Sequence, residues 1–102
     1  MAQDEFSYPI GTAAISWFDS SGGLHIRVYS TDGYHVTERC MDPEGGWKTG
    51  AFAEAGSQVS ATCWNDGEGV HLRVYCTFQD ATIEWCNDPG KGWTKGAYTT
   101  AD

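Results

Sequence analysis

Apolar and polar residues alternate strictly along two stretches of the chain, residues 24–30 and 70–76. In the first stretch Leu24, Ile26 and Val28 fall on one face of an extended strand, and the His, Arg and Tyr between them fall on the other. No segment shows a sustained helical period. The pattern therefore predicts an all-β protein.

Four short strands are predicted in each half of the chain, separated by turns rich in Gly, Asn and Asp-Pro. The predicted strands are residues 13–18, 24–30, 35–40 and 46–52 in the first half, and 59–64, 70–76, 81–86 and 92–98 in the second. Four antiparallel strands in about 46 residues match the size of one propeller blade.

The second half of the chain repeats the first. Four residues of the first half recur 46 positions later. The pairs are Arg27 and Arg73, Glu38 and Glu84, Cys40 and Cys86, and Trp47 and Trp93. We place the repeats at about 13–54 and about 58–102, after an N-terminal extension, residues 1–12, and expect the two repeats to form one domain.

Two blades cannot close a ring, because propellers typically have about 4–8 of them. The two outer blade faces would be buried if subunits joined head to tail in a closed oligomer. This reasoning leaves two, three or four copies open.

Charge narrows the classes of partner. Six basic against fourteen acidic residues give a net charge of −8, which argues against nucleic acid and against anionic membrane surfaces. No apolar run is long enough to span a membrane, so we expect no membrane insertion. The N-terminal residues do not resemble a signal peptide, and both a cytoplasmic location and export by a non-classical route stay open.

Each repeat offers an Arg on its second strand, a Glu on its third and a Trp on its fourth. One interpretation is structural, a cross-strand ion pair beside a core indole. The other is a sugar site. A guanidinium donates to ring and hydroxyl oxygens, a carboxylate accepts from neighbouring hydroxyls, and an indole offers a flat face to sugar C–H groups. Recurrence in both repeats, and an Arg in the middle of an apolar strand, favour the sugar site.

The phrases "IRVY", "TERC" and "GAF" in the first repeat, and "LRVY", "IEWC" and "GWTKGAY" in the second, resemble the fucose-specific lectins of the Aleuria type, especially their short two-repeat members. The resemblance runs from about residue 13 to the C-terminus. It implies a six-bladed β-propeller, two four-stranded blades per chain, assembled as a homotrimer that binds L-fucose and fucosylated glycans between adjacent blades. It implies an intrasubunit pocket made of Arg27, Glu38, Ala51, Asn87 and Trp93, and an intersubunit pocket made of Arg73, Glu84, Ala97, Met41 and Trp47.

The chain departs from those members at one position in each repeat. They usually carry an aromatic residue directly after the cysteine of the third strand, where this chain has Met41 and Asn87. A methionine still packs against a methyl group, whereas an asparagine cannot replace a stacked ring. We therefore predict unequal sites, with the Met41 pocket the tighter one.

The alternatives are a glycoside hydrolase and a protein-binding scaffold. A hydrolase fits poorly, because an Arg beside each Glu would keep it ionised. The histidines His25, His35 and His71 show no metal-ligand spacing, so we expect no metal and no cofactor, and interpret them as polar packing residues. Among the cysteines, Cys63 and Cys76 are either free thiols or a cross-strand disulfide.

Overall fold

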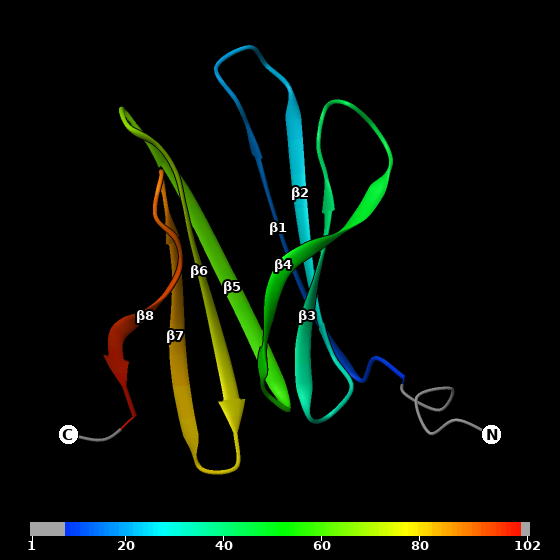
Figure 1. Cartoon of the computed structure of the whole chain (residues 1–102), viewed down its shortest axis with the longest axis vertical. Helices are drawn as coiled ribbons and strands as arrows, with labels where there is room; N and C mark the ends of the chain where they lie inside the picture. Colours follow the sequence, from blue (N-terminus) through cyan, green and yellow to red (C-terminus); the bar gives the residue numbers. More distant parts are fainter. Residues whose placement is uncertain (1–7, 101–102) are drawn as a thin grey trace.

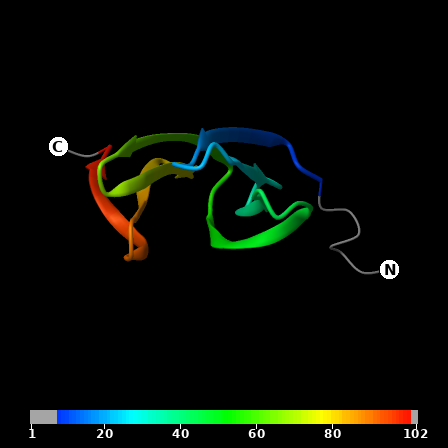
Figure 2. The ribbon, with the colours of Figure 1, turned by 90° about the horizontal axis from the view of Figure 1, so that it is seen from above.

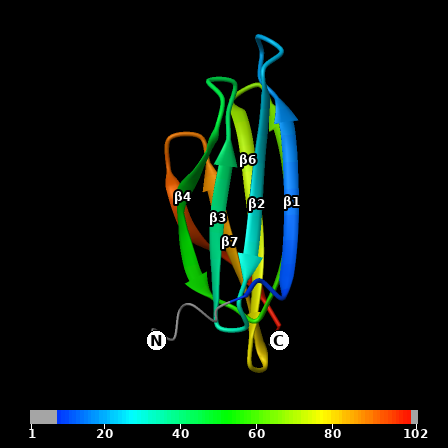
Figure 3. The same cartoon turned by 90° about the vertical axis from the view of Figure 1, so that its right-hand side faces the viewer.

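The computed structural model describes residues 8–100 and confirms the all-β class. Its eight strands form two four-stranded antiparallel sheets, in the order β1-β2-β3-β4 and β5-β6-β7-β8. The two sheets lie beside each other with their strands along a common long direction (Figures 1 and 3). The strands are β1 (Gly11–Phe18), β2 (Leu24–Thr31), β3 (His35–Met41), β4 (Trp47–Ala55), β5 (Gln58–Asp66), β6 (Gly69–Phe78), β7 (Ala81–Asp88) and β8 (Gly92–Thr99).

Each sheet is a simple up-and-down meander, as the repeat predicts, and we call the two sheets blade 1 and blade 2. The first strand begins at Gly11, two residues before the predicted start, because Gly11 and Thr12 extend the ladder with β2. Most of the predicted N-terminal extension, residues 1–7, lies outside the described residues.

The two blades meet mainly along their first strands, β1 and β5 (Figure 2). The last strand of blade 1, β4, also contacts β6 of blade 2. Two hydrogen bonds join equivalent strands directly. The Asn65 side chain donates to the Phe18 carbonyl oxygen at 3.2 Å, and the Cys63 thiol to the Ser16 carbonyl oxygen at 3.5 Å. Each of these pairs is 47 residues apart. Equivalent positions of the repeat are therefore neighbours in space.

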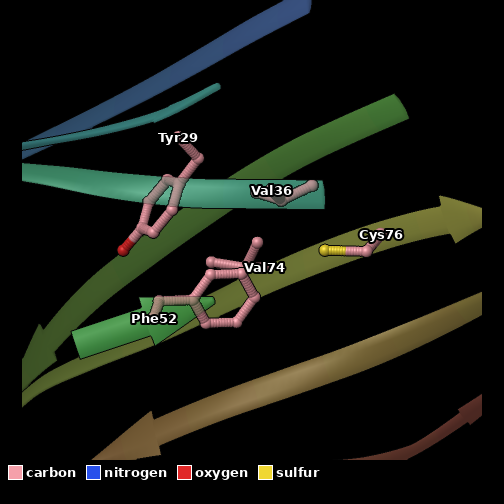
Figure 4. Close-up of a cluster of buried hydrophobic side chains, with 5 residues drawn as sticks. All are labelled: Tyr29, Val36, Phe52, Val74 and Cys76. Carbon is pink, nitrogen blue, oxygen red and sulfur yellow. The ribbon is translucent and has the colours of Figure 1, made fainter. Parts of the chain in front are cut away.

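The hydrophobic core lies between the blades. Blade 1 contributes Tyr29, Val36 and Phe52, and blade 2 contributes Val74 and Cys76 (Figure 4). The two blades use opposite faces for this contact. Blade 1 turns the side that carries Tyr29 toward blade 2, whereas blade 2 turns the side that carries Val74, which is the equivalent of Val28. Like faces do not meet, so each blade keeps one face that the other blade does not cover.

The disulfide alternative is wrong. Cys63 pairs with Leu72 in the β5–β6 register, and Cys76 pairs with Val59, so the two cysteines do not face each other. All four cysteines are free. The sequence showed that both cysteines lie on adjacent strands but did not fix the register.

No helix among the described residues is long and apolar enough to cross a membrane.

Candidate sugar-binding site

A pocket of about 500 Å³ opens between the two blades. Blade 1 lines it with Arg27, Glu38 and Ala51, and blade 2 with Asn87 and Trp93. These are the five residues predicted for the intrasubunit site, and the structure brings all of them to one cavity. Five further residues complete the wall: Trp17, Cys40, Val70, Leu72 and Gly92.

Glu38 reaches this pocket because of a bulge in blade 1. The β3–β4 register runs from Thr37 opposite Ala53 to Arg39 opposite Thr49, so one residue of β3 faces three residues of β4. Those three residues, Gly50 to Phe52, belong to the phrase "GWKTGAF" of blade 1, which recurs as "GWTKGAY" in blade 2. The Glu38 carboxylate fills the gap in the ladder, since the Phe52 amide donates to its Oε1 at 3.2 Å.

Gly50 leaves the space for this carboxylate. A Cβ at Gly50 would overlap Oε1 of Glu38 and would lie 2.7 Å from the Cys40 sulfur. In blade 2, a Cβ at Gly96 would likewise overlap Oε1 of Glu84. The glycine of each phrase therefore belongs to the site, because any side chain there would displace the carboxylate.

A tyrosine holds the other carboxylate oxygen. The Tyr29 hydroxyl donates to Oε2 of Glu38 at 2.7 Å, and the Tyr75 hydroxyl donates to Oε2 of Glu84 at 2.8 Å. The Tyr75 bond, followed by the Tyr98 amide, lowers the pKa of Glu84 below its usual range. Glu38 itself is only 4% exposed, so its bonds form in a largely dry environment.

The nearest acid to Arg27 is Asp42 rather than the predicted Glu38. Nη1 of Arg27 donates to Oδ1 of Asp42 at 2.9 Å, and also to the Ile26 carbonyl oxygen at 3.0 Å. In blade 2 Arg73 donates to Asp88 at 2.8 Å, while its Nε lies 4.0 Å from Glu84. The expected close Arg–Glu pair is thus replaced by an Arg–Asp pair, because each Arg leans toward the Asp-Pro turn that follows the third strand.

Sequence reasoning also missed an aromatic partner. The Trp17 indole lies under the Arg27 guanidinium, whose Cζ is 5.0 Å from the ring centroid, and it stacks on His25 at 5.1 Å. In blade 2 Trp64 makes the same contacts with Arg73 and His71. The recurrence of this Trp on the first strand of each repeat was a signal in the sequence that could have identified it.

Trp93 belongs both to the pocket and to the core. Its indole packs edge-on against Phe52, with centroids 4.7 Å apart, and against Tyr29 at 6.3 Å. A structural role for Trp93 and a role in binding are therefore compatible, because the indole packs on the core and also lines the cavity.

The five residues predicted for the intersubunit site are not brought together within one chain. Arg73, Glu84 and Ala97 belong to blade 2, and Met41 pairs with Trp47 at the β3–β4 end of blade 1. Arg73 lies on the face of blade 2 opposite to the one that carries Leu72 and Val74, so it points away from blade 1. A second copy would have to complete this pocket.

No group of three His, Cys, Asp or Glu side chains with metal-binding geometry occurs between residues 8 and 100.

The fold and pocket define a pair of propeller-type blades with a polar and aromatic cavity between them. A lectin described as SapL1, in complex with α-methyl fucoside, matches 88% of this chain at 32% sequence identity with a TM-score of 0.73. The chain covers 32% of that lectin, about a third of its length.

The family described as fungal fucose-specific lectin matches residues 5–102. The chain belongs to this family. None of the curated proteins compared with the chain matches it.

Proposed function

We propose that the chain is a multivalent lectin that binds L-fucose and fucosylated glycans in pockets between adjacent blades. The observation that carries the proposal is the cavity where a guanidinium, a carboxylate and an indole converge from two blades. These are the donor, the acceptor and the flat apolar face that a deoxy sugar requires. Membership of a fucose-specific lectin family supports the same ligand.

The chemistry of the pocket favours binding over hydrolysis. A glycosidase needs a second carboxyl group at a defined distance and one acid with a raised pKa. Glu38 is the one carboxylate among the described residues that line this pocket, so its wall offers no second carboxyl group. Isothermal titration with α-methyl fucoside tests the binding, and a chromogenic fucoside tests the turnover. We expect saturable binding without turnover; absence of binding at millimolar fucoside would refute the proposal.

We further propose that three copies form a six-bladed ring. Inside the chain, Tyr29 and Phe52 meet edge-on at 5.7 Å, and Trp93 of blade 2 covers the pair. Blade 2 carries the equivalent pair, Tyr75 and Tyr98, at 5.8 Å. No residue of the described chain has the position on this second pair that Trp93 has on the first.

The equivalent of Trp93 in blade 1 is Trp47. Within one chain Trp47 is 46% exposed and Tyr98 is 49% exposed. A second copy packed head to tail would place its Trp47 on Tyr75 and Tyr98 and would complete the pocket of Arg73 with Met41. Because opposite blade faces meet, this contact repeats in one direction, and it gives a closed ring when the rotation between copies divides a full turn. One copy covers 32% of the SapL1 lectin, so three copies would cover nearly all of it.

The oligomeric state is measured by size-exclusion chromatography with light scattering. We expect a mass of three chains. A monomer at micromolar concentration would refute the ring, while fucoside binding to such a monomer would leave the intrasubunit site standing.

The two kinds of pocket would differ in affinity. Asn87 stands opposite Trp93, and Met41 stands opposite Trp47, at equivalent places in the ladders. We propose that the Met41 pocket is tighter, since its side chain packs on the apolar edge of the sugar. Restoring a ring with Asn87→Trp should tighten the intrasubunit pocket about tenfold, given about 1–3 kcal/mol for a stacked ring. Two resolved affinities in calorimetry of the native protein would support the difference, and equal affinities would refute it.

A further inference from the structure

Each blade contains a histidine bound between two carboxylates. In blade 1, Nδ1 of His25 lies 2.7 Å from Oδ1 of Asp42, and Nε2 lies 2.9 Å from Oδ2 of Asp19. A carboxylate only accepts hydrogen bonds, so both ring nitrogens must carry a proton for both bonds to form. The geometry therefore requires an imidazolium.

Asp42 also accepts from the arginine of the pocket. Its Oδ1 receives Nη1 of Arg27 at 2.9 Å as well as the His25 ring. Every hydrogen bond that Arg27 donates within the described chain comes from Nη1. Nη2 and Nε are thereby left for a ligand, and their direction depends on where Asp42 holds Nη1.

The far end of the bridge is also anchored. Oδ1 of Asp19 accepts the amides of Ser21 at 2.9 Å and Gly23 at 2.8 Å. A Cβ at Gly23 would lie 2.8 Å from Oδ2 of Asp19 and 2.6 Å from the Pro43 ring. The bridge thus ties the β1–β2 turn to the turn that follows β3.

We propose that His25 is a positioning residue for the pocket: as an imidazolium it fixes the Asp42 carboxylate, which in turn holds the Arg27 guanidinium at the sugar. The inference rests on the proposed fucose site and adds a pH dependence to it. Blade 2 repeats the arrangement independently, with His71 at 2.6 Å from Asp88 and 2.8 Å from Asp66.

The surroundings of His25 are an aromatic ring and several acids. Trp17 stacks on its ring. A hollow of about 340 Å³ beside Asp19 is lined by acids of the facing β5–β6 turn. The charged groups that face His25 or its partners are Asp19, Asp42, Arg27, Asp66 and Glu68.

The sign of the pH effect follows from these neighbours. The bond to Asp19, opposed by partial burial and aided by Asp42, raises the pKa of His25 above 6.5. The bridge is therefore complete at and below pH 6.5 and is lost as the pH rises through the raised pKa. A neutral ring donates only one hydrogen bond, so one carboxylate then faces a lone pair. We expect fucoside affinity to fall on the alkaline side.

The test is calorimetry of the full-length protein with α-methyl fucoside from pH 5 to pH 9, a range in which the fucoside does not titrate. We expect the wild-type affinity to fall by about three- to tenfold across the range, which lies within the range found for residues that couple to a site without touching the ligand. The double variant H25F/H71F keeps rings that can stack on the tryptophans but has no donor. It should bind more weakly at pH 5 and show no pH dependence. H35Q changes a histidine outside the bridge and should keep the wild-type profile.

Two results would overturn the inference: a flat wild-type profile, or a double variant that still depends on pH as the wild type does. If H25F/H71F fails to fold, nitrogen NMR of the wild-type histidines without sugar decides, because the proposal requires both nitrogens of His25 to be protonated at pH 6. If the wild-type protein binds no fucoside at any pH, the proposed function itself is refuted.

Discussion

Replacing Gly50 by alanine tests the reasoning about the bulge most directly. In an ordinary strand the change would stabilise the protein by about 0.4–1 kcal/mol, because alanine restricts the unfolded chain. Here the new Cβ would overlap Oε1 of Glu38 and would lie 2.6 Å from its Cδ. The carboxylate must move, and its bonds to Tyr29 at 2.7 Å and to the Phe52 amide at 3.2 Å break.

Hydrogen bonds to a charged group contribute about 1.5–3 kcal/mol each. We therefore expect Gly50→Ala to lower the free energy of unfolding by about 3 kcal/mol, a large part of the about 5–15 kcal/mol typical of a domain. Urea unfolding followed by tryptophan fluorescence measures the loss. Gly67→Ala is the matched control, because a Cβ there meets nothing within 4 Å. If Gly50→Ala is as stable as Gly67→Ala, the close approach of Glu38 to the strand is not real.

Three further predictions concern other parts of the molecule. Tyr29→Phe removes only a hydroxyl and should lower both stability, by about 1–3 kcal/mol, and fucoside affinity, because the acid it holds becomes free to turn; unchanged affinity in calorimetry would contradict this. Trp93→Ala should destabilise the isolated chain in thermal unfolding, since the indole packs on the core, whereas Trp47→Ala should act on the mass of the oligomer and on half of the sites; identical effects of the two would argue against head-to-tail assembly. In a native thiol titration Cys63 should react first and Cys76 last, because burial raises the pKa of Cys76 to about 12 and leaves it 2% exposed; a missing thiol would indicate a disulfide after all.

The repeat in the sequence was sufficient to predict the fold. Alternation placed the eight strands, and the lag between the repeats gave two blades. The resemblance also placed Arg27, Glu38 and Trp93 together, and they line one cavity; their role in binding a sugar stays a prediction.

What the sequence did not reveal depends on register and on side-chain direction. Nothing in the letters shows that β4 has two extra residues opposite Glu38, and so the role of Gly50 was missed. His25 and Asp42 recur in the second repeat as His71 and Asp88. The two members of each pair are 17 residues apart, and they come together only when the strands that carry them are aligned.

The bulge has a consequence for how such a binding site can change over time. The acid that the ligand would meet also completes the hydrogen bonding of its own sheet, so a chain that loses this acid loses part of its framework as well. Substitutions at Glu38 and at the facing Gly50 would therefore destabilise the blade and would not be neutral. Met41 and Asn87 do not complete the hydrogen bonding of a bulge; each pairs with a tryptophan, Met41 in the last pair of the β3–β4 ladder and Asn87 in the last but one of the β7–β8 ladder. New sugar preferences in this lineage would therefore arise at these two positions, where a substitution alters the pocket and leaves the blade intact.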